Sequence, residues 1–380
     1  MDFLEHFESY KTDNQFEAFQ IGSNIINQNF DFEKINIAIF GVLDDRSAIN
    51  NKGCASAPDE VRKFLYKLSN VSEKIQIADL GNIHPGNSLN DTYFAVANTI
   101  EFLVKKNVIP ILIGGSQDIT YANYLAYNKL EQVVNIVSID SKFDLGKDDD
   151  ITNENYLSKI IMHQPNNLFN YSNIGYQSYF VDTKELELMD KLFFDVYRLG
   201  IFTENIHLAE PVIRDADIIS FDISAVRQSD APANINASPN GFYGQQACQL
   251  ARYAGISDKL SSIGFYEINP QIKDNGQTAH LCAQMIWYFI EGVANRKNDF
   301  PVGEKTNYLK YNVTLHEGKD VVNFYKSPKS DRWWMEVPFP QHNKLKYERH
   351  LLVPCSYNDY QQACKNELPD KWVKTYNKLI

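Results

Sequence analysis

Three aspartates in this chain stand where carboxylates could bind a cation. Asp140 and Asp144 follow the apolar run VVNIVSI, and Asp222 follows the run ADIISF. Alternate residues of an extended chain point to the same side, so Asp140, Lys142 and Asp144 are expected to share one side. Carboxylate oxygens are typical ligands of hard divalent cations. Three of them at neighbouring strand ends predict a cation site, past or present.

Two further polar residues follow apolar runs in the same way. Gln117 comes shortly after VIPILIGG, and Glu267 comes directly after SSIGFY. In an open parallel sheet, ligands bind beyond the carboxyl ends of the strands. The same edge of the sheet is therefore expected to carry all five of these residues.

The elements that must position these residues follow an alternating pattern. The apolar runs are rich in Val, Ile and aromatic residues and lack polar alternation, which is typical of strands buried on both faces of a parallel sheet. Helix-like segments lie between them, at 57–69, 90–106, 117–130, 182–191, 242–255 and 277–296. This alternation predicts an α/β fold, a three-layer α/β/α doubly wound and mostly parallel sheet.

The character of the chain changes near residue 300. We predict an α/β domain over residues 1–300 and a C-terminal extension over 301–380, packed on that domain or projecting from it. The extension is expected to hold a β-hairpin around His316–Lys319 and short helices. Trp333 and Trp334 either form an exposed patch that binds a partner or pack the extension onto its own domain.

The amino-acid composition limits the kinds of partner and environment that are expected for this protein. The net charge of −11 repels phosphate backbones, so nucleic-acid binding is not expected. The five cysteines are scattered and odd in number, which argues against a disulfide framework and favours the reducing cytoplasm. No stretch approaches the ~18 apolar residues of a membrane-spanning helix.

Taken together and in order, the strand-end motifs resemble those of the ureohydrolases, the manganese enzymes that include arginase, agmatinase and formimidoylglutamase. Their motifs G-G-D-H, D-A-H-x-D and S-F-D-x-D correspond here to residues 114–117, 140–144 and 220–224. The resemblance covers roughly residues 35–296, and formimidoylglutamase is the nearest subfamily. It implies hydrolysis of a linear amidine, a guanidino or formimino compound, by a hydroxide bridging two Mn²⁺ ions. It also implies a homo-oligomer.

Half of the metal ligands that the resemblance implies are changed. Asp140, Asp144 and Asp222 are retained, whereas the other three positions hold Gln117, Lys142 and Ser224. Glutamine and serine are weak neutral ligands, and the lysine ammonium would stand where a cation should bind. We interpret Lys142 as an internal counter-cation for the three aspartates, because buried unpaired charges are costly.

Two residues are candidates for catalysis through the same resemblance. Glu267 matches the acidic residue that contacts the cationic group of the substrate, and His163 lies near the region of a proton-shuttling histidine. Each has a structural alternative. Glu267 precedes an Asn-Pro turn that it could stabilise, and His163 could be a surface histidine.

Three functions follow from these observations. The one we favour is a catalytically inactive protein of this fold that binds no metal and serves as a binding or scaffold protein, with the C-terminal extension offering a surface to a protein partner. The second is a C–N hydrolase with one Mn²⁺ held by the three aspartates, helped by Gln117 and Ser224. The third is a sensor that binds a guanidinium compound or an amino acid through Glu267.

Overall fold

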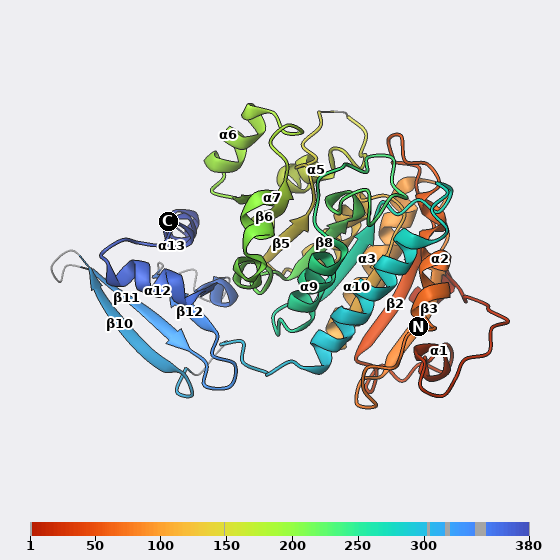
Figure 1. Cartoon of the computed structure of the whole chain (residues 1–380), viewed down its shortest axis with the longest axis horizontal. Helices are drawn as coiled ribbons and strands as arrows, with labels where there is room; N and C mark the ends of the chain where they lie inside the picture. The colour runs from red at the N-terminus through yellow and green to blue at the C-terminus, as the bar shows by residue number, and fades with distance from the viewer. Residues whose placement is uncertain (1, 148, 302–304, 316–319, 339–346, 380) are drawn as a thin grey trace.

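A nine-stranded sheet forms the centre of the main domain in this computed structural model, which describes residues 2–147, 149–301, 305–315, 320–338 and 347–379 (Figure 1). The strand order is β1-β3-β2-β4-β9-β8-β5-β6-β7. Only the edge pair β1–β3 is antiparallel, and the other pairs are parallel. The strands are β1 Phe7–Glu8, β2 Ile37–Val42, β3 Ile77–Ile83, β4 Ile109–Ile113, β5 Val134–Ile139, β6 Leu168–Tyr176, β7 Asp195–Arg198, β8 Ile218–Asp222 and β9 Ser262–Tyr266.

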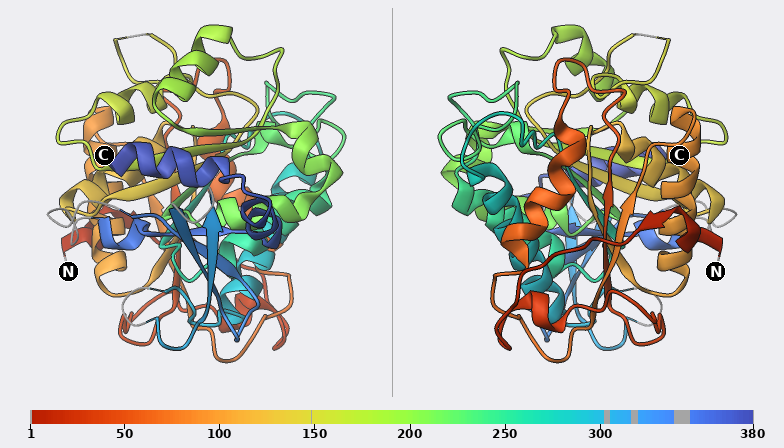
Figure 2. Two further views of the ribbon diagram at one scale, coloured as in Figure 1. Left: turned by 90° about the vertical axis from the view of Figure 1, so that its left-hand side faces the viewer. Right: turned by 90° about the vertical axis from the view of Figure 1, so that its right-hand side faces the viewer.

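Helices cover both faces of this sheet (Figure 2). Helices α2, α9 and α10 pack on one face, and helices α3, α4 and α5 pack on the other. The helices of the main domain are α1 Ile21–Asn24, α2 Ala57–Leu65, α3 Leu89–Lys105, α4 Ile119–Lys129, α5 Tyr156–Met162, α6 Thr183–Lys191, α7 Leu199–Glu204, α8 Glu210–Ile213, α9 Gly244–Gly255 and α10 Gln277–Ala294. The predicted three-layer α/β/α fold is confirmed.

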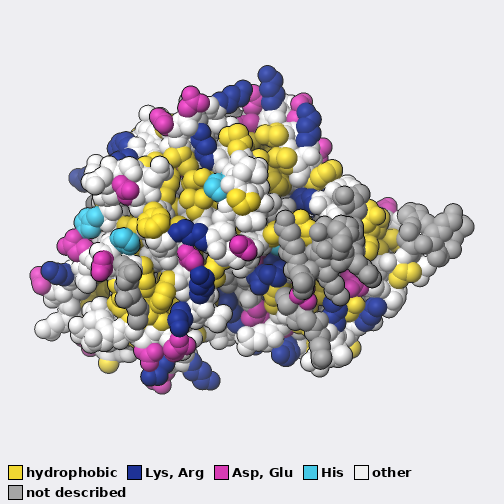
Figure 3. Space-filling view, turned by 180° about the vertical axis from the view of Figure 1, so that it is seen from behind, with side chains coloured by type: hydrophobic (Ala, Val, Ile, Leu, Met, Phe, Trp, Pro, Cys, Tyr) yellow, Lys and Arg dark blue, Asp and Glu magenta, His cyan; other side chains and the backbone are white. Residues whose placement is uncertain are grey.

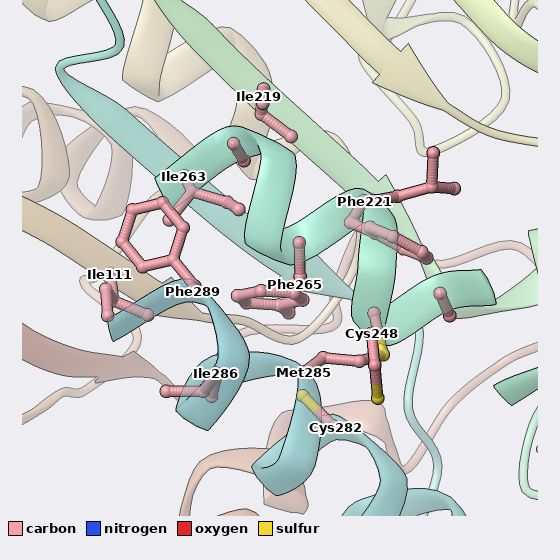
Figure 4. Packing of buried hydrophobic residues seen from close by; sticks show 14 of the residues in the cluster. Ile111, Ile219, Phe221, Cys248, Ile263, Phe265, Cys282, Met285, Ile286 and Phe289 are labelled. Atoms are coloured by element: carbon pink, nitrogen blue, oxygen red, sulfur yellow. The ribbon is translucent and has the colours of Figure 1, made fainter. Parts of the chain in front are cut away.

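The core explains why the strand sequences show no polar alternation. Ile111 and Ile113 of β4 face the layer of α9 and α10, whereas Leu112 faces the layer of α3 and α4. Figure 4 shows the first of these layers, where Phe265 of β9 lies beside Met285 of α10. Because both faces are covered, every residue of a central strand is buried.

The C-terminal extension forms a second, antiparallel sheet of order β10-β11-β12-β13. Strands β10 and β11 pair as a hairpin with Leu315 opposite Asp320. This confirms the predicted hairpin, although its turn, His316–Lys319, lies outside the described residues. The elements of the extension are β10 Leu309–Leu315, β11 Asp320–Lys326, β12 Trp333–Glu336, β13 Leu352–Cys355, α12 Tyr357–Cys364 and α13 Asp370–Leu379.

Charged contacts join the extension to the main domain at the amino ends of the parallel strands. The Lys371 ammonium lies 3.2 Å from the carboxylate of Asp215, and the Arg349 guanidinium lies 2.8 Å from that of Asp217. Both aspartates immediately precede β8. The guanidinium of Arg214 donates hydrogen bonds to backbone carbonyls of β12 and β13. The extension therefore packs against the end of the main sheet where the parallel strands begin, opposite to their carboxyl ends.

Trp333 and Trp334 lie inside this arrangement. Their exposed fractions are 8% and 1%. The Arg214 guanidinium lies 4.5 Å from the centre of a Trp334 ring, and Trp333 packs against Tyr311 and Tyr360. The interpretation of this pair as an exposed binding patch is therefore wrong, because both rings are covered by the protein's own residues.

The surface carries charged side chains of both signs. Basic and acidic side chains are interspersed on the face shown in Figure 3. Within the described residues, no helix has the length and apolarity needed to cross a membrane.

Candidate functional site

Four strand ends meet at the middle of the carboxyl edge. Strands β4, β9, β8 and β5 are neighbours in that order, and Gln117, Glu267, Asp222 and Asp140 stand at or just beyond their carboxyl ends. The chain order reverses here, because β4 and β5 are consecutive in sequence but are separated in the sheet by β8 and β9. Such a reversal places ligand-binding residues in one crevice.

Gln117 is turned toward a group of hydroxyls. Its side-chain amide nitrogen lies 3.2 Å from the Tyr156 hydroxyl and from the Ser220 hydroxyl, and 3.4 Å from the Ser138 hydroxyl. The side chain is buried. The amide thus serves as a hydrogen-bond donor within the protein, at the position where the resemblance implies a metal-binding imidazole.

Asp140 and Asp144 form a carboxyl pair. The Oδ1 atom of Asp140 accepts a hydrogen bond of 3.0 Å from the backbone nitrogen of Lys142. Asp144 has a left-handed backbone, with φ of 54°, and its carboxyl is near enough to that of Asp140 for the two to affect each other's pKa. Burial, reinforced by the charge of Asp140, raises the pKa of Asp144 well above its usual range. Burial and the neighbouring carboxylate therefore both oppose ionisation of Asp144.

This geometry differs from the expected one. The strand stops at Ile139, and the chain then turns, so residues 140–144 do not continue as an extended segment. Asp144 lies near Asp140 because the chain turns after the strand, so the alternation of side chains along a strand does not apply here. Asp144 itself has a positive φ, a conformation that aspartate tolerates better than most residues.

Lys142 contributes less than expected. Among the described residues, no ion pair within 4.0 Å joins its ammonium to the three aspartates. Its charge lowers the pKa of Asp140 and of Asp144, but burial outweighs it in both cases. The interpretation of Lys142 as a direct counter-cation is therefore revised. Its charge acts on both aspartates without an ion pair.

Asp222 and Ser224 are held by a short turn. The Oδ1 atom of Asp222 accepts a 2.6 Å hydrogen bond from the backbone nitrogen of Ser224. Burial, and then the charges of Asp140 and Glu267, raise the pKa of Asp222 well above its usual range. The Ser224 hydroxyl lies 3.4 Å from the hydroxyl of Ser141. The serine thus lies at the site, beside the chain segment that follows β5.

Glu267 is fully engaged by the protein. Its Oε1 accepts hydrogen bonds from the backbone nitrogen of Gln117, at 2.9 Å, and from the side chain of Asn153, at 3.1 Å. Its Oε2 accepts one of 2.7 Å from the side chain of Asn51. Burial raises the pKa of this carboxyl to about 7. The arrangement ties three loops to the end of β9, which supports the structural alternative for this residue.

His163 lies apart from these residues. It follows α5, and its ring contacts Tyr121 and Tyr124 of helix α4. Its Nδ1 lies 3.0 Å from the Tyr121 hydroxyl. Because residue 163 comes five positions before β6 begins, it lies toward the amino end of that strand. The structure does not bring His163 to the aspartates, so it does not support a proton-shuttle role there.

The structure adds residues that the sequence did not single out. Asp118 is buried and accepts hydrogen bonds from the hydroxyls of Ser116 and Tyr93, and burial raises its pKa to about 6. Its position directly after Gln117 was a usable signal. Asn51 and Asn153 carried none, because they come from loops far away in sequence.

These donors do not fit a centre of two manganese ions. The Gln117 amide nitrogen faces hydroxyls, burial and the charge of Asp140 oppose ionisation of Asp144, and Lys142 adds a positive charge. Within the described residues, no group of three or more His, Cys, Asp or Glu side chains is arranged to hold a metal ion. The buried Oδ2 atom of Asp140 has no hydrogen-bond partner among the described residues.

Comparison with known proteins places the chain in a family. The family model described as the arginase family matches residues 35–291. That range holds the parallel strands β2 to β9 and ends before the C-terminal sheet.

Two similar curated proteins are formimidoylglutamases. A formimidoylglutamase of Staphylococcus haemolyticus is 28% identical over 296 residues, covering 73% of this chain and 93% of that protein. A formimidoylglutamase of Staphylococcus aureus (strain MRSA252) is 27% identical over 267 residues, covering 67% and 86%.

Solved structures share the fold. The formimidoylglutamase of Bacillus subtilis aligns with a TM-score of 0.67 at 18% identity, over 76% of this chain and 96% of that one. The Mn²⁺-containing formiminoglutamase of Trypanosoma cruzi aligns with a TM-score of 0.65 at 17% identity, over 73% and 99%. Because the family model covers more than half of the sequence, the chain belongs to the arginase family.

Proposed function

We propose that this chain is a catalytically inactive member of the arginase family that serves as a binding or scaffold protein. The observation that carries the proposal is the altered donor set at the strand ends. Gln117, Lys142 and Ser224 replace strong ligands, and the side-chain amide of Gln117 is used in hydrogen bonds within the protein.

The chemical consequence concerns the nucleophile. Hydrolysis of an amidine at neutral pH needs water activated to hydroxide, and a bound divalent ion does this by lowering the pKa of water to ≈ 7. A lysine ammonium has a single charge and no open coordination position. The four acidic groups have raised pKa values, with burial as the largest cause. These residues alone do not replace the metal.

Two other functions remain as alternatives. A hydrolase of linear amidines with one Mn²⁺ is favoured by the names of the relatives and by the unpartnered Oδ2 of Asp140. A sensor of a guanidinium compound or an amino acid would use Glu267. The sensor is less favoured, since three protein donors already satisfy that carboxylate.

The amount of manganese bound per chain distinguishes these three functions. The purified protein is dialysed against excess Mn²⁺, freed of unbound ion, and its bound manganese per chain is measured by elemental analysis. Release of urea, formamide or ammonia from guanidino and formimino compounds is assayed in parallel. We expect no bound ion and no release. Two ions per chain would overturn the proposal, and one ion with turnover would establish the mononuclear hydrolase.

A matched variant calibrates the measurement. Gln117→His, Lys142→His and Ser224→Asp introduced together restore the ligand types that the family motifs carry. We expect this triple variant to take up manganese where the natural chain does not. Equal uptake by the two proteins would contradict the view that these three positions abolish the site.

A further inference from the structure

A cavity lies on the carboxyl edge, beside the aspartates. Its volume is about 450 Å³, and its walls come from residues 176–179, 198–200, 203, 239–241 and 243 together with Arg227. These segments follow β6, β7 and β8. The backbone nitrogen of Gln177 donates a 3.0 Å hydrogen bond to the carbonyl of Ser141, the residue after Asp140. The cavity therefore adjoins the aspartate cluster but uses none of its side chains.

The charge of this cavity is opposite to that of the chain. The chain carries a net charge of −11, yet the described lining residues include Arg198 and Arg227 and neither aspartate nor glutamate. Such a concentration of positive charge attracts an anion. We call this feature the arginine cavity.

Both guanidinium groups keep donors available. Arg198 is exposed, and no ion pair or hydrogen bond of its side chain occurs among the described residues. The Nε atom of Arg227 lies 3.0 Å from a carboxylate oxygen of Asp230, and no hydrogen bond of its terminal nitrogens is found in the described part of the chain. Terminal guanidinium nitrogens form the fork that binds carboxylate and phosphate groups in a bidentate manner.

The walls hold these donors in place and add aromatic surface. The Arg227 guanidinium lies 3.9 Å from the centre of the Tyr243 ring, and this stacking restricts its orientation. Gln177 links two walls, since its side-chain nitrogen donates to the carbonyl of Asn240 and its side-chain oxygen accepts from the Tyr179 hydroxyl. Tyr179 is 63% exposed and Tyr243 is 49% exposed. Aromatic surface is thus open to a planar ligand.

We propose that the arginine cavity binds a small organic anion, whose carboxylate or phosphate group pairs with Arg198 and Arg227 and whose planar part lies against the tyrosines. The site goes beyond the proposed function, because it requires neither a metal nor the aspartates. If the cavity binds no anion, the proposal of an inactive arginase-family protein is unaffected. If it does bind one, the kind of ligand that such a protein binds is identified.

The test uses simple probes on the full-length chain. Benzoate, phenyl phosphate and inorganic phosphate are titrated at low ionic strength, by calorimetry and by shift of the melting temperature. We expect saturable binding of one molecule of benzoate or phenyl phosphate per chain. The tighter of the two identifies the preferred oxyanion. Inorganic phosphate is expected to bind more weakly, and equal binding would overturn the part assigned to the tyrosines.

Variants locate the binding. Arg198→Gln removes an exposed cation without breaking a described contact, and Arg227→Lys keeps the charge but loses the planar fork. Each is expected to weaken binding at least about tenfold, as loss of a charged hydrogen bond does. Lys184→Gln removes one positive charge from nearby helix α6 and is expected to leave binding unchanged. Absence of saturable binding at millimolar probe, or equal weakening by Lys184→Gln, would overturn the site.

Discussion

At the scale of single residues, the main feature of the site is a set of carboxyl groups whose ionisation is opposed by burial. Asp140, Asp144, Asp222 and Glu267 all have raised pKa values, with burial as the largest cause. Uncompensated carboxylates are costly in such surroundings. Hydrogen bonds compensate Glu267, and the raised pKa of Asp144 favours its neutral form. Lys142 lies too far away to form an ion pair.

The raised pKa of Asp144 leads to a prediction about this residue. Asparagine resembles a protonated aspartate, so Asp144→Asn removes the ionised form. The folded pKa of Asp144 is raised, so its ionisation costs stability as the pH rises through that value. We therefore expect the variant to be more stable than the natural chain at pH 8, by on the order of 1 kcal/mol, measured by chemical denaturation.

Two variants serve as controls for that measurement. Asp190→Asn removes an exposed carboxylate on α6, and we expect it to leave stability unchanged within about 0.5 kcal/mol. Lys142→Ala is also expected to have a small effect, since its ammonium forms no direct pair. A large loss of stability in Lys142→Ala, with none gained in Asp144→Asn, would restore Lys142 as the counter-cation.

The sequence located some site residues and missed others for a physical reason. Asp140, Asp222 and Glu267 follow strands that a run of apolar residues makes recognisable, so their convergence could be expected. Asp144 could not be placed, because the period of two holds only while the strand continues. The Asn51 and Asn153 contacts with Glu267 join positions 216 and 114 residues apart, and no local pattern reports such pairs.

At the scale of elements, the strands and helices were more predictable than their order. The segment 90–106 was expected to be helical, and α3 spans Leu89–Lys105 behind a capping box formed by Ser88 and Asp91. The position of β9 between β4 and β8 was not predictable, since it depends on packing between distant segments. The docking edge of the extension was not predictable either, because Arg214 and its partners lie in short connections.

Arg214 offers a prediction about this docking. Its guanidinium binds the carbonyls of Trp333 and Cys355 and stacks on Trp334. Arg214→Ala is expected to leave those carbonyls without donors and to cost about 1–3 kcal/mol. Amide hydrogen exchange should rise in β12 and β13 and stay unchanged in β4 and β8.

The control for this experiment is another arginine. Arg252→Ala breaks a more exposed ion pair with Glu291 on the outer helices, where such pairs contribute little. Exchange in the C-terminal sheet should then equal that of the natural chain. Equal exchange in the Arg214 and Arg252 variants would mean that Arg214 does not hold the extension.

At the scale of the whole molecule, the two edges of the main sheet have different roles. The extension covers the amino edge and buries charged groups there, including Asp215, Asp217 and Lys259. The carboxyl edge keeps the aspartates and the arginine cavity. The extension therefore leaves the carboxyl ends of the strands uncovered.

The buried groups between domain and extension make docking sensitive to acid. Burial, together with the charge of Lys259, lowers the pKa of His350 to about 3, from 6.5 in the unfolded chain. Burial opposes ionisation of Asp215, but Lys259 and Lys371 outweigh it and lower its pKa to about 2. In both cases the unfolded chain binds a proton more readily, so stability falls as the pH drops. The His350 contribution is lost from about pH 6.5 downward, and that of Asp215 below about pH 4.

One buried acid at the carboxyl ends of the strands responds in the opposite direction, and this difference gives the prediction. Asp118 has a raised pKa of about 6, so its protonation stabilises the folded chain as the pH falls toward 4. Between pH 7 and pH 4.5 we therefore expect amide exchange to rise in β13 and α13 while the parallel strands stay protected. His350→Gln keeps a donor for the carbonyl of Val133, which His350 contacts at 3.1 Å, and cannot gain a proton. The variant should lose most of the acid response, and an undiminished response would exclude His350 as its source.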